Sequence, residues 1–521
     1  MEIGFEMSSV DNRRIAKNTL VLYVRMLFTM AVSLYTVRVV LNTLGVVDYG
    51  LNNVVGGVVS MFAFLSGTMA SASQRFLAFE MGVNDITKLK KTFSTIVIIY
   101  FIVAAIVLIS AETVGLWFLN EKMTIPGERM EAARWVYQFS IFSFIVVILN
   151  IPYNSIIIAH ENMQVFAYVS IFDALLKLGI VYLLTIFAVD KLKLYAVLTF
   201  VVTLSVAFVY RSVCKRKYEE SGVVFVFDKA LFKTILSYSG WNLFGAVTTV
   251  LNNQGLNILL NIFFGPVVNA SRAVAYQVNN AITSFTSNFY TAVNPQIIKS
   301  YAVKDRVRMI SLVFAGSKFA FFMLLLLSLP IFIEMKFILS LWLSQVNDYM
   351  ITFTRLIILF SLVNVLENPL TQVVRATGNI KNYQIAVGTV TLLTLPVTYV
   401  LFKYNLPPES AFIVLIFIYF ISTFVRLVVL RQLIDFPVWD YIKEILIKIS
   451  FVTFASCLIP MFLYYMIENF WYNLFATTVS SLVSVACVVY AWGLNDVERG
   501  FIIQYLNKTK NRLMRNEQKT I

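Results

Sequence analysis

The sequence predicts an all-α integral membrane protein with about fourteen transmembrane helices. Of its 521 residues, 59% are hydrophobic, which is more apolar surface than a soluble domain could bury. Apolar stretches of about 20 residues, the length that crosses a bilayer, follow one another nearly to the C-terminus. Features of the first half also recur in the second half, where Phe264-Gly265 repeats Leu44-Gly45 at the end of a long apolar helix.

The predicted helices form two repeated halves followed by an unpaired pair. We expect them, in order, at 15–41, 50–73, 92–119, 134–159, 164–189, 191–212, 231–263, 267–293, 309–333, 351–374, 381–403, 410–431, 444–467 and 474–494. Because each half holds six helices, the halves share one orientation and are related by a pseudo-twofold axis along the membrane normal. The predicted organisation is an N-terminal six-helix lobe (1–213), a cytoplasmic linker (214–230), a C-terminal six-helix lobe (231–431), two added helices (444–494) and a basic cytoplasmic tail (495–521).

Several loop features support the internal repeat. An aspartate stands in a basic loop before the third helix of each half, and a Pro-x6-Ala-x2-Asn pattern occurs once in each half: Asp85 and Asp305, then Pro152, Ala159 and Asn162 with Pro369, Ala376 and Asn379. We expect the linkers 74–91 and 295–308 to form short amphipathic helices on the cytoplasmic surface. Duplicated bundles place a pathway between their halves, so transport is the starting hypothesis.

The net charge of +14 follows from membrane topology. Lysine and arginine gather in alternate loops, and the positive-inside rule then places both termini in the cytoplasm with an even number of spans. Nucleic-acid binding is not needed to explain these charges. The three cysteines, Cys214, Cys457 and Cys487, are scattered and are expected to be free thiols without a disulfide framework.

The first helix carries an unusual polar face. Asn18, Arg25 and Thr29 fall within a narrow arc, and Arg25 lies well inside the span. A charge near the bilayer centre costs about 2.5–3.5 kcal/mol on insertion scales. We therefore expect Arg25 to face a wet cavity or a partner.

The seventh and eighth helices carry a second polar face. Arg272, Tyr276 and Asn279 recur at helical spacing on the eighth helix, and Asn253 and Asn257 recur on the seventh. These side chains either hydrogen-bond between helices or line a cavity, where asparagine and tyrosine suit sugar hydroxyls. The sequence does not decide between the two interpretations.

Four further charges lie within predicted spans. Asp173 and Lys177, one turn apart, form either an internal ion pair or a site for a proton, an ion or a substrate. Lys318 and Glu367 are additional candidates for ion coupling or cavity charge. Glu367 precedes Pro369, where we expect the helix to break, and freed carbonyls beside a carboxylate can bind a cation.

The sequence gives no sign of an enzyme. His160, the only histidine, lies in a short turn without a nucleophile near it in the sequence, and no Walker A, HExxH or Gly-x-Ser-x-Gly motif is found. We expect no catalytic residues, no metal and no cofactor. Energy then comes from an H+ or Na+ gradient or from downhill flow.

Four segments resemble a known family. Arg14-Ile15-Ala16-Lys17-Asn18-Thr19, Arg38 through Leu44-Gly45, Asp48-Tyr49-Gly50 and Ser73-Gln74-Arg75-Phe76 resemble polysaccharide-biosynthesis flippases. These belong to the multidrug/oligosaccharidyl-lipid/polysaccharide (MOP) exporter superfamily, and the Wzx-type O-antigen and capsule flippases are the nearest branch. The likeness is densest over about the first 180 residues, and the repeated layout extends it to about residue 430.

The resemblance implies a V-shaped pair of six-helix lobes, as in MATE transporters. It also implies alternating access that moves polyprenyl-diphosphate-linked oligosaccharide, a precursor of O-antigen, capsule or exopolysaccharide, across the bacterial inner membrane. A polymerase and glycosyltransferases are the implied partners. In the related lipid II flippase, arginines on the first and eighth helices contact the diphosphate, which implies this role for Arg25 and Arg272. That relative also has two extra C-terminal helices, whereas the Wzx pattern has twelve helices in all.

Two other functions fit the sequence less well. A multidrug/cation antiporter of the same superfamily needs a cavity rich in carboxylates. Asp173 and Glu367 favour it, whereas the basic residues Arg25, Arg272 and Lys318 do not. A membrane-bound polymerase or ligase needs a sizeable outer loop with catalytic residues, and the predicted outer loops are short.

Overall fold

In the computed structural model of the chain, all regular elements of the described residues are helical. The structure describes residues 9–60, 63–121, 125, 127–187, 189–222, 228–343, 346–467, 470–496 and 498–500. Within these ranges, ten helical segments are long and apolar enough to cross a membrane. The predicted all-α, multi-pass architecture is therefore confirmed. Most of the predicted basic tail, together with linker residues 223–227, lies outside the described ranges.

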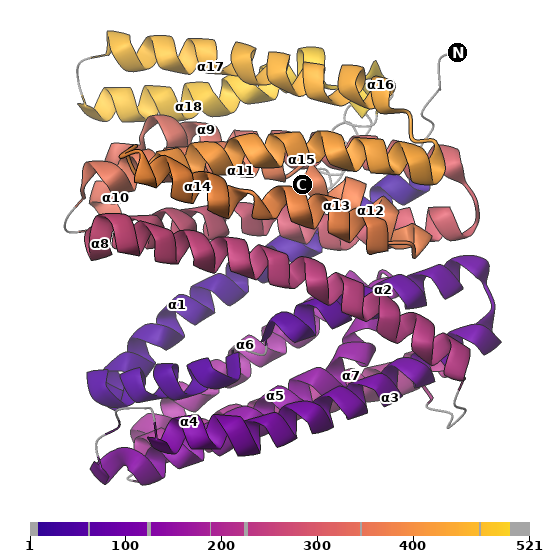
Figure 1. The fold of residues 1–521 in the computed structure, drawn as a ribbon, viewed down its shortest axis with the longest axis vertical. Coiled ribbons are helices and arrows are strands. Elements are labelled where there is room, and N and C mark those ends of the chain that lie inside the picture. Colours follow the sequence, from indigo (N-terminus) through magenta and orange to yellow (C-terminus); the bar gives the residue numbers. More distant parts are fainter. Residues whose placement is uncertain are drawn as a thin grey trace, which may run out of the picture. The chain divides into compact units, whose positions relative to one another are not determined.

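The chain divides into two compact units. The N-terminal unit contains residues 16–246 and 301–303, and the C-terminal unit contains 1–15, 247–300 and 304–521. The main helices are α1 (Ser9–Ser60), α2 (Ala63–Val83), α3 (Ile86–Ser110), α4 (Leu116–Glu121), α5 (Met130–Ala159), α6 (Met163–Ile186), α7 (Lys191–Lys217), α8 (Lys229–Ala302), α9 (Arg306–Ile333), α10 (Met335–Trp342), α11 (Asp348–Asn364), α12 (Glu367–Thr377), α13 (Lys381–Leu392), α14 (Thr394–Lys403), α15 (Ser410–Ile434), α16 (Val438–Tyr441), α17 (Lys448–Met466) and α18 (Phe470–Val488) (Figure 1).

The predicted repeat appears in the backbone as two matching kinks. Gly45 interrupts α1 with a φ of 78°, and Gly265 interrupts α8 with a φ of 80°. Positive φ is readily adopted by glycine because it has no Cβ atom. The prediction that both glycines end a long apolar helix is confirmed.

The third helix of each half also begins in the same way. The side chains of Asp85 and Asp305 each accept a hydrogen bond of 3.0 Å from a backbone N–H three residues later, at Lys88 and Arg308. Both aspartates therefore cap a helix N-terminus, which satisfies a donor that the first turn leaves free. The repeated aspartates have a structural role that the sequence pattern located.

The expectation of separate surface helices before α3 and α9 was wrong. Helix α2 continues without a break to Val83 and α8 continues to Ala302, so both linkers are mostly extensions of the spans. Packing of Arg75 explains this in the first half. Its guanidinium lies over the rings of Phe76, Phe79 and Tyr238 at 4.5, 5.1 and 5.5 Å, so this buried cation does not require a surface position.

Each unit has its own apolar core. In the N-terminal unit, Val136, Tyr137 and Ile141 of α5 pack against neighbouring helices, including Leu192 of α7. In the C-terminal unit, Phe353 of α11 packs with Phe412 of α15, with ring centroids 4.6 Å apart. These cores fix the helices that carry the polar side chains considered below.

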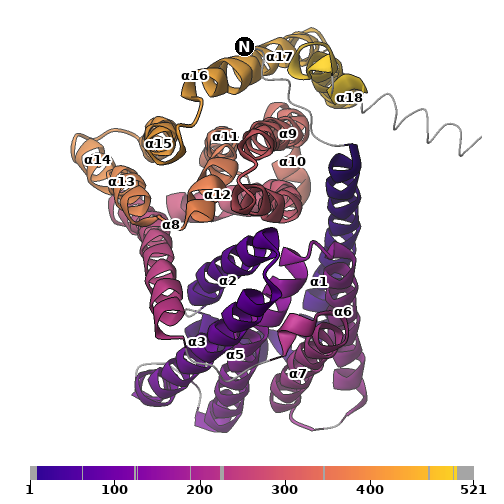
Figure 2. The same cartoon turned by 90° about the vertical axis from the view of Figure 1, so that its right-hand side faces the viewer.

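The two added helices belong to the C-terminal unit. Helices α17 and α18 lie side by side along α9 (Figure 1), and α16 connects α15 to α17 (Figure 2). The most apolar stretch of α9 is 72% buried, compared with 22–56% for the other candidate spans. Helix α9 is thus the most enclosed of the candidate spans in the described part of the chain.

Candidate functional site

Arg25 of the N-terminal unit lies against α6. Its Nη1 atom is 3.4 Å from Ser170 Oγ, and its guanidinium carbon lies 4.8 Å from the centre of the Phe166 ring. The Ser170 hydroxyl donates to the Phe166 carbonyl at 2.8 Å, so its oxygen can accept from Arg25. A polar contact and an aromatic face together hold the guanidinium within the helix bundle.

The two other predicted polar residues of α1 bond to backbone. The Asn18 side chain donates to the Glu161 carbonyl at 3.1 Å, in the turn between α5 and α6. The Thr29 hydroxyl donates to the Met26 carbonyl of its own helix, also at 3.1 Å. Asn18 therefore ties α1 to the α5–α6 turn, whereas the bond of Thr29 stays within its own helix.

Asp173 and Lys177 form an ion pair on α6. Their Oδ2 and Nζ atoms are 2.8 Å apart, and both side chains are partly exposed. The internal pair that the four-residue spacing allows is therefore present. A role in binding an ion or a substrate remains a prediction.

Arg272 is the centre of a polar cluster in the C-terminal unit. It lies on α8 beyond Gly265 and donates 2.8 Å to the carbonyl of Asn253, which precedes the kink. Its guanidinium carbon lies 4.3 Å from the centre of the Tyr276 ring, and the Tyr276 hydroxyl is 3.4 Å from Asn253 Oδ1. The kink thus brings together a cation, a phenol and an amide, and their mutual bonds correspond to the first of the two interpretations that the sequence left open.

The two remaining asparagines of this face differ in burial. Asn257 is half-buried and donates to Gln254 at 3.5 Å. Asn279 is buried, and its side-chain oxygen accepts a hydrogen bond from the Ser361 hydroxyl of α11. Asn279 therefore links two helices, whereas the bond of Asn257 stays within α8.

Glu367 begins α12, directly after the break that follows α11. Its Oε1 atom is 2.7 Å from Nη2 of Arg426 on α15, and the Glu367 and Arg426 side chains are 33% and 2% exposed. Arg426 also donates to the Tyr383 hydroxyl at 3.1 Å and to the Ser422 hydroxyl at 2.9 Å. The break expected near Pro369 is present, and the carboxylate beside it is already paired with a buried cation.

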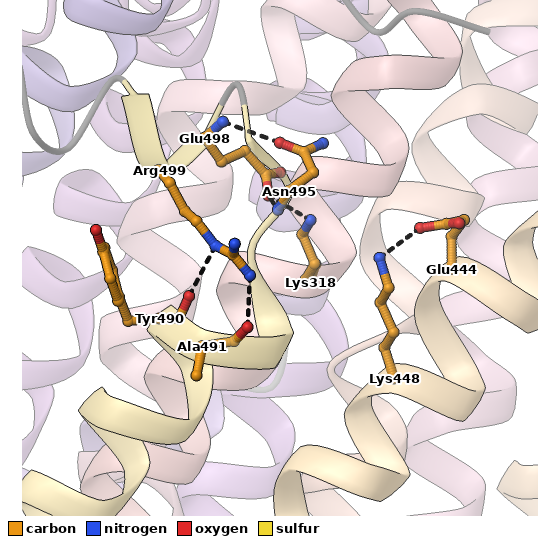
Figure 3. Close-up of polar contacts among 8 residues, drawn as sticks. All are labelled: Lys318, Glu444, Lys448, Tyr490, Ala491, Asn495, Glu498 and Arg499. Atoms are coloured by element: carbon orange, nitrogen blue, oxygen red, sulfur yellow. Dashed lines mark hydrogen bonds and ion pairs between the residues drawn. The ribbon is translucent and has the colours of Figure 1, made fainter. Parts of the chain in front are cut away.

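Sequence reasoning missed Arg426. Its only signal was a charge inside the apolar stretch predicted as the helix 410–431, and its partners lie on other helices. Lys318 is paired as well, with Glu498 at 2.6 Å, near the end of the described chain (Figure 3). Both contacts stabilise charges that would otherwise be costly within the membrane.

A further charged group joins three segments of the N-terminal unit. The Arg129 guanidinium pairs with Asp48, which follows the kink in α1, and lies 2.9 Å from Asp190, the residue that caps α7. Asp48 is buried, so its pairing compensates for lost solvation. The group fastens one end of α1, α5 and α7 together.

His160 takes part in a polar cluster outside the spans. Its ring pairs with Glu220 and stacks on Tyr218, with ring centroids 4.2 Å apart. Burial raises the pKa of Glu220, but hydrogen bonds from His160 and the backbone, together with attraction by the His160 ring, bring the pKa below its ordinary 4.5. This cluster attaches the start of the linker to the α5–α6 turn.

No metal site is formed by the part of the chain that the structure describes. Within it, no three His, Cys, Asp or Glu side chains are grouped to hold an ion. The charged side chains identified above are paired or lie against aromatic rings.

Comparison with known proteins identifies the fold. No protein-family model matches the chain, and no curated protein matches it. A crystal structure of MATE in the straight conformation matches with a TM-score of 0.66 at 14% identity, covering 83% of this chain and 97% of that one. The chain has the MATE fold.

Two further structures support the same fold. The outward-facing conformation of a multidrug resistance MATE family transporter of the MOP superfamily matches with a TM-score of 0.67, at 14% identity, covering 80% of this chain and 95% of that one. A MOP superfamily transporter from Pyrococcus furiosus, described by the reverse polarity of its binding pocket, matches with a TM-score of 0.64, at 14% identity and with coverage of 82% and 96%. The matched MATE proteins are covered almost completely, whereas part of this chain has no counterpart in them.

Proposed function

We propose that this protein is a flippase that moves polyprenyl-diphosphate-linked oligosaccharide across the bacterial inner membrane by alternating access. The substrate would be a precursor of O-antigen, capsule or exopolysaccharide. The MATE fold supports a membrane transporter of the MOP superfamily. Both termini would lie in the cytoplasm, as the distribution of basic residues predicts.

The Arg272 cluster is the observation that carries the proposal. A guanidinium matches phosphate oxygens in geometry and charge, so Arg272 is suited to a diphosphate. The amide of Asn253 and the hydroxyl of Tyr276, both within reach of each other, are suited to the hydroxyl groups of a sugar. One cluster therefore offers groups for both parts of a lipid-linked sugar.

Arg25 supports the same chemistry in the N-terminal unit. Its guanidinium lies within the helix bundle, where its contacts include the hydroxyl of Ser170 and the ring of Phe166. A guanidinium at this position has the charge and the geometry to bind an anionic head group. We assign Arg25 and Arg272 to the diphosphate.

The second candidate function is a multidrug/cation antiporter, and the fold supports it equally. Asp173 and Glu367 are the carboxylates that would bind a cation coupled to transport. Each already lies within 2.8 Å of a basic side chain, Lys177 or Arg426. A cation would have to displace that basic group, which makes the flippase the better-supported proposal.

Complementation with arginine variants tests the proposal. Arg25→Ala and Arg272→Ala should each abolish glycan export while the protein still inserts, because a charge-assisted contact contributes about 1.5–3 kcal/mol, or about 10- to 150-fold in binding. Lysine variants keep the charge but lose the bidentate geometry, so they should retain partial export. Arg431→Ala, at an exposed position in the last turn of α15, is the matched control and should export normally.

The outcome can separate the two functions. Loss of export in both alanine variants, with unchanged protein in the membrane, supports diphosphate binding. Normal export in both removes the assignment of these arginines. Unchanged glycan together with sensitivity to cationic drugs in a strain lacking the protein would support the antiporter instead.

A further inference from the structure

A short polar structure follows α18. The Asn495 side chain accepts from the Glu498 N–H, and Glu498 Oε2 accepts from the Asn495 N–H, both at 2.9 Å. This reciprocal pair is a capping box that starts a new helical turn. Arg499 folds back and donates to the carbonyls of Tyr490 and Ala491 at the end of the preceding helix (Figure 3). We call the described residues of 495–499 the C-terminal anchor.

The C-terminal anchor pairs with a buried cation on α9. Lys318 Nζ lies 2.6 Å from Glu498 Oε2, the oxygen that also completes the capping box. The Lys318 side chain is 6% exposed and the Glu498 side chain 15% exposed. A buried pair of this kind makes removal of one partner costly, because the remaining charge has no compensation. Lys318 is therefore occupied by the chain itself.

Two more contacts set the register of α17 and α18 on α9. At the far end of α9, the Thr477 hydroxyl of α18 donates to the buried carboxylate of Glu334. Glu334 follows Lys318 by sixteen residues, which corresponds to about 24 Å along a helix. Between them, a Cβ atom on Gly493 would lie 2.8 Å from the Phe322 ring, so the backbone approaches α9 closely there. The α17–α18 hairpin is thus fixed along most of α9.

We propose that the C-terminal anchor locks the α17–α18 hairpin onto α9, with Lys318 as the positioning residue that holds Glu498. The hairpin then moves with α9 as one rigid part of the C-terminal unit. Lys318 serves this lock and does not carry a coupling ion. The inference is independent of the transported substrate, since it rests on contacts within one unit.

Point variants in the full-length chain test the lock. Glu498→Ala should lower the thermal midpoint of the purified protein and increase hydrogen exchange in α17, α18 and α9, while exchange in α5 and α7 stays unchanged. Lys318→Met should have a smaller effect, because Glu498 keeps its capping box. The double variant should recover part of the loss, because it no longer contains an uncompensated buried cation but still lacks the capping box.

An exposed pair next to the lock provides the control. Glu444 and Lys448 lie 2.7 Å apart, at nearly the same separation as Lys318 and Glu498, but their side chains are 51% and 32% exposed. Glu444→Ala should therefore change neither the thermal midpoint nor the hydrogen exchange of α17, α18 and α9. Recovery in the Lys318→Met/Glu498→Ala double variant supports the lock. If the double variant is as impaired as Glu498→Ala alone, or if exchange in α17 and α18 does not change, the proposal is overturned.

Discussion

Replacing Glu367 with alanine should destabilise the C-terminal unit more than any exposed ion-pair variant. Arg426 is enclosed, with a side chain that is 2% exposed, and Glu367 is its partner at 2.7 Å. Glu367→Ala leaves the hydroxyls of Tyr383 and Ser422, which are neutral, as the remaining hydrogen-bond partners among those identified. The buried guanidinium would then lack a compensating negative charge.

The expected loss of unfolding free energy depends on which partner of the ion pair is removed. Breaking a buried pair and leaving its charge uncompensated costs about 3–5 kcal/mol. Arg426→Met leaves Glu367, whose side chain is 33% exposed and can be solvated, so we expect a smaller loss of about 1–3 kcal/mol. The double variant replaces the pair with apolar groups and should be less destabilised than Glu367→Ala.

Unfolding of purified protein in mild detergent, titrated with a denaturing detergent, measures these differences. Glu444→Ala is the control because Glu444 and Lys448 also lie 2.7 Å apart, but their side chains are 51% and 32% exposed, so neither charge is enclosed as Arg426 is. An exposed pair on one helix contributes about 0.3–0.5 kcal/mol. Equal losses of unfolding free energy in Glu367→Ala and Glu444→Ala would refute the reasoning. A Glu367→Ala/Arg426→Met double variant that is less stable than either single variant would also refute it.

Two further variants test packing and pH dependence. Gly255→Ala should destabilise the C-terminal unit, because the added Cβ would lie 2.6 and 2.7 Å from the Leu395 methyl groups, and Leu395→Ala should restore part of the thermal midpoint. Attachment of the linker should be complete above pH 4.5 and should weaken as the pH falls, because the pKa of Glu220 is lower in the folded protein. Proteolysis of the linker across this range measures the attachment, and Glu220→Gln should remove the dependence on pH.

The helical framework was predictable because it depends on local patterns. Apolar length identified the membrane-spanning helices, and the repeated Leu44-Gly45 and Phe264-Gly265 pairs located both kinks. The predicted bounds of the second helix, 50–73, were less accurate, because α2 spans Ala63–Val83. Helix α2 extends to Val83 and contains Arg75, whose guanidinium lies over aromatic rings, and that packing is not visible in a periodicity.

The polar clusters were predictable where one helix carries their members. The four-residue spacings of Asp173 with Lys177 and of Arg272 with Tyr276 place each pair on one helix face, and both pairs are in contact. Arg426 was missed because its carboxylate partner belongs to another helix. The same limit applies to Lys318, whose partner is 180 residues away in the sequence.

A strain lacking this protein tests the proposed function most directly. Lipid-linked oligosaccharide and surface polysaccharide should be measured together in that strain. We predict that a completed lipid-linked unit accumulates on the cytoplasmic face while surface glycan is lost, and mass spectrometry of that unit would identify the substrate. Unchanged surface glycan with increased sensitivity to cationic drugs would contradict the flippase proposal and favour the antiporter.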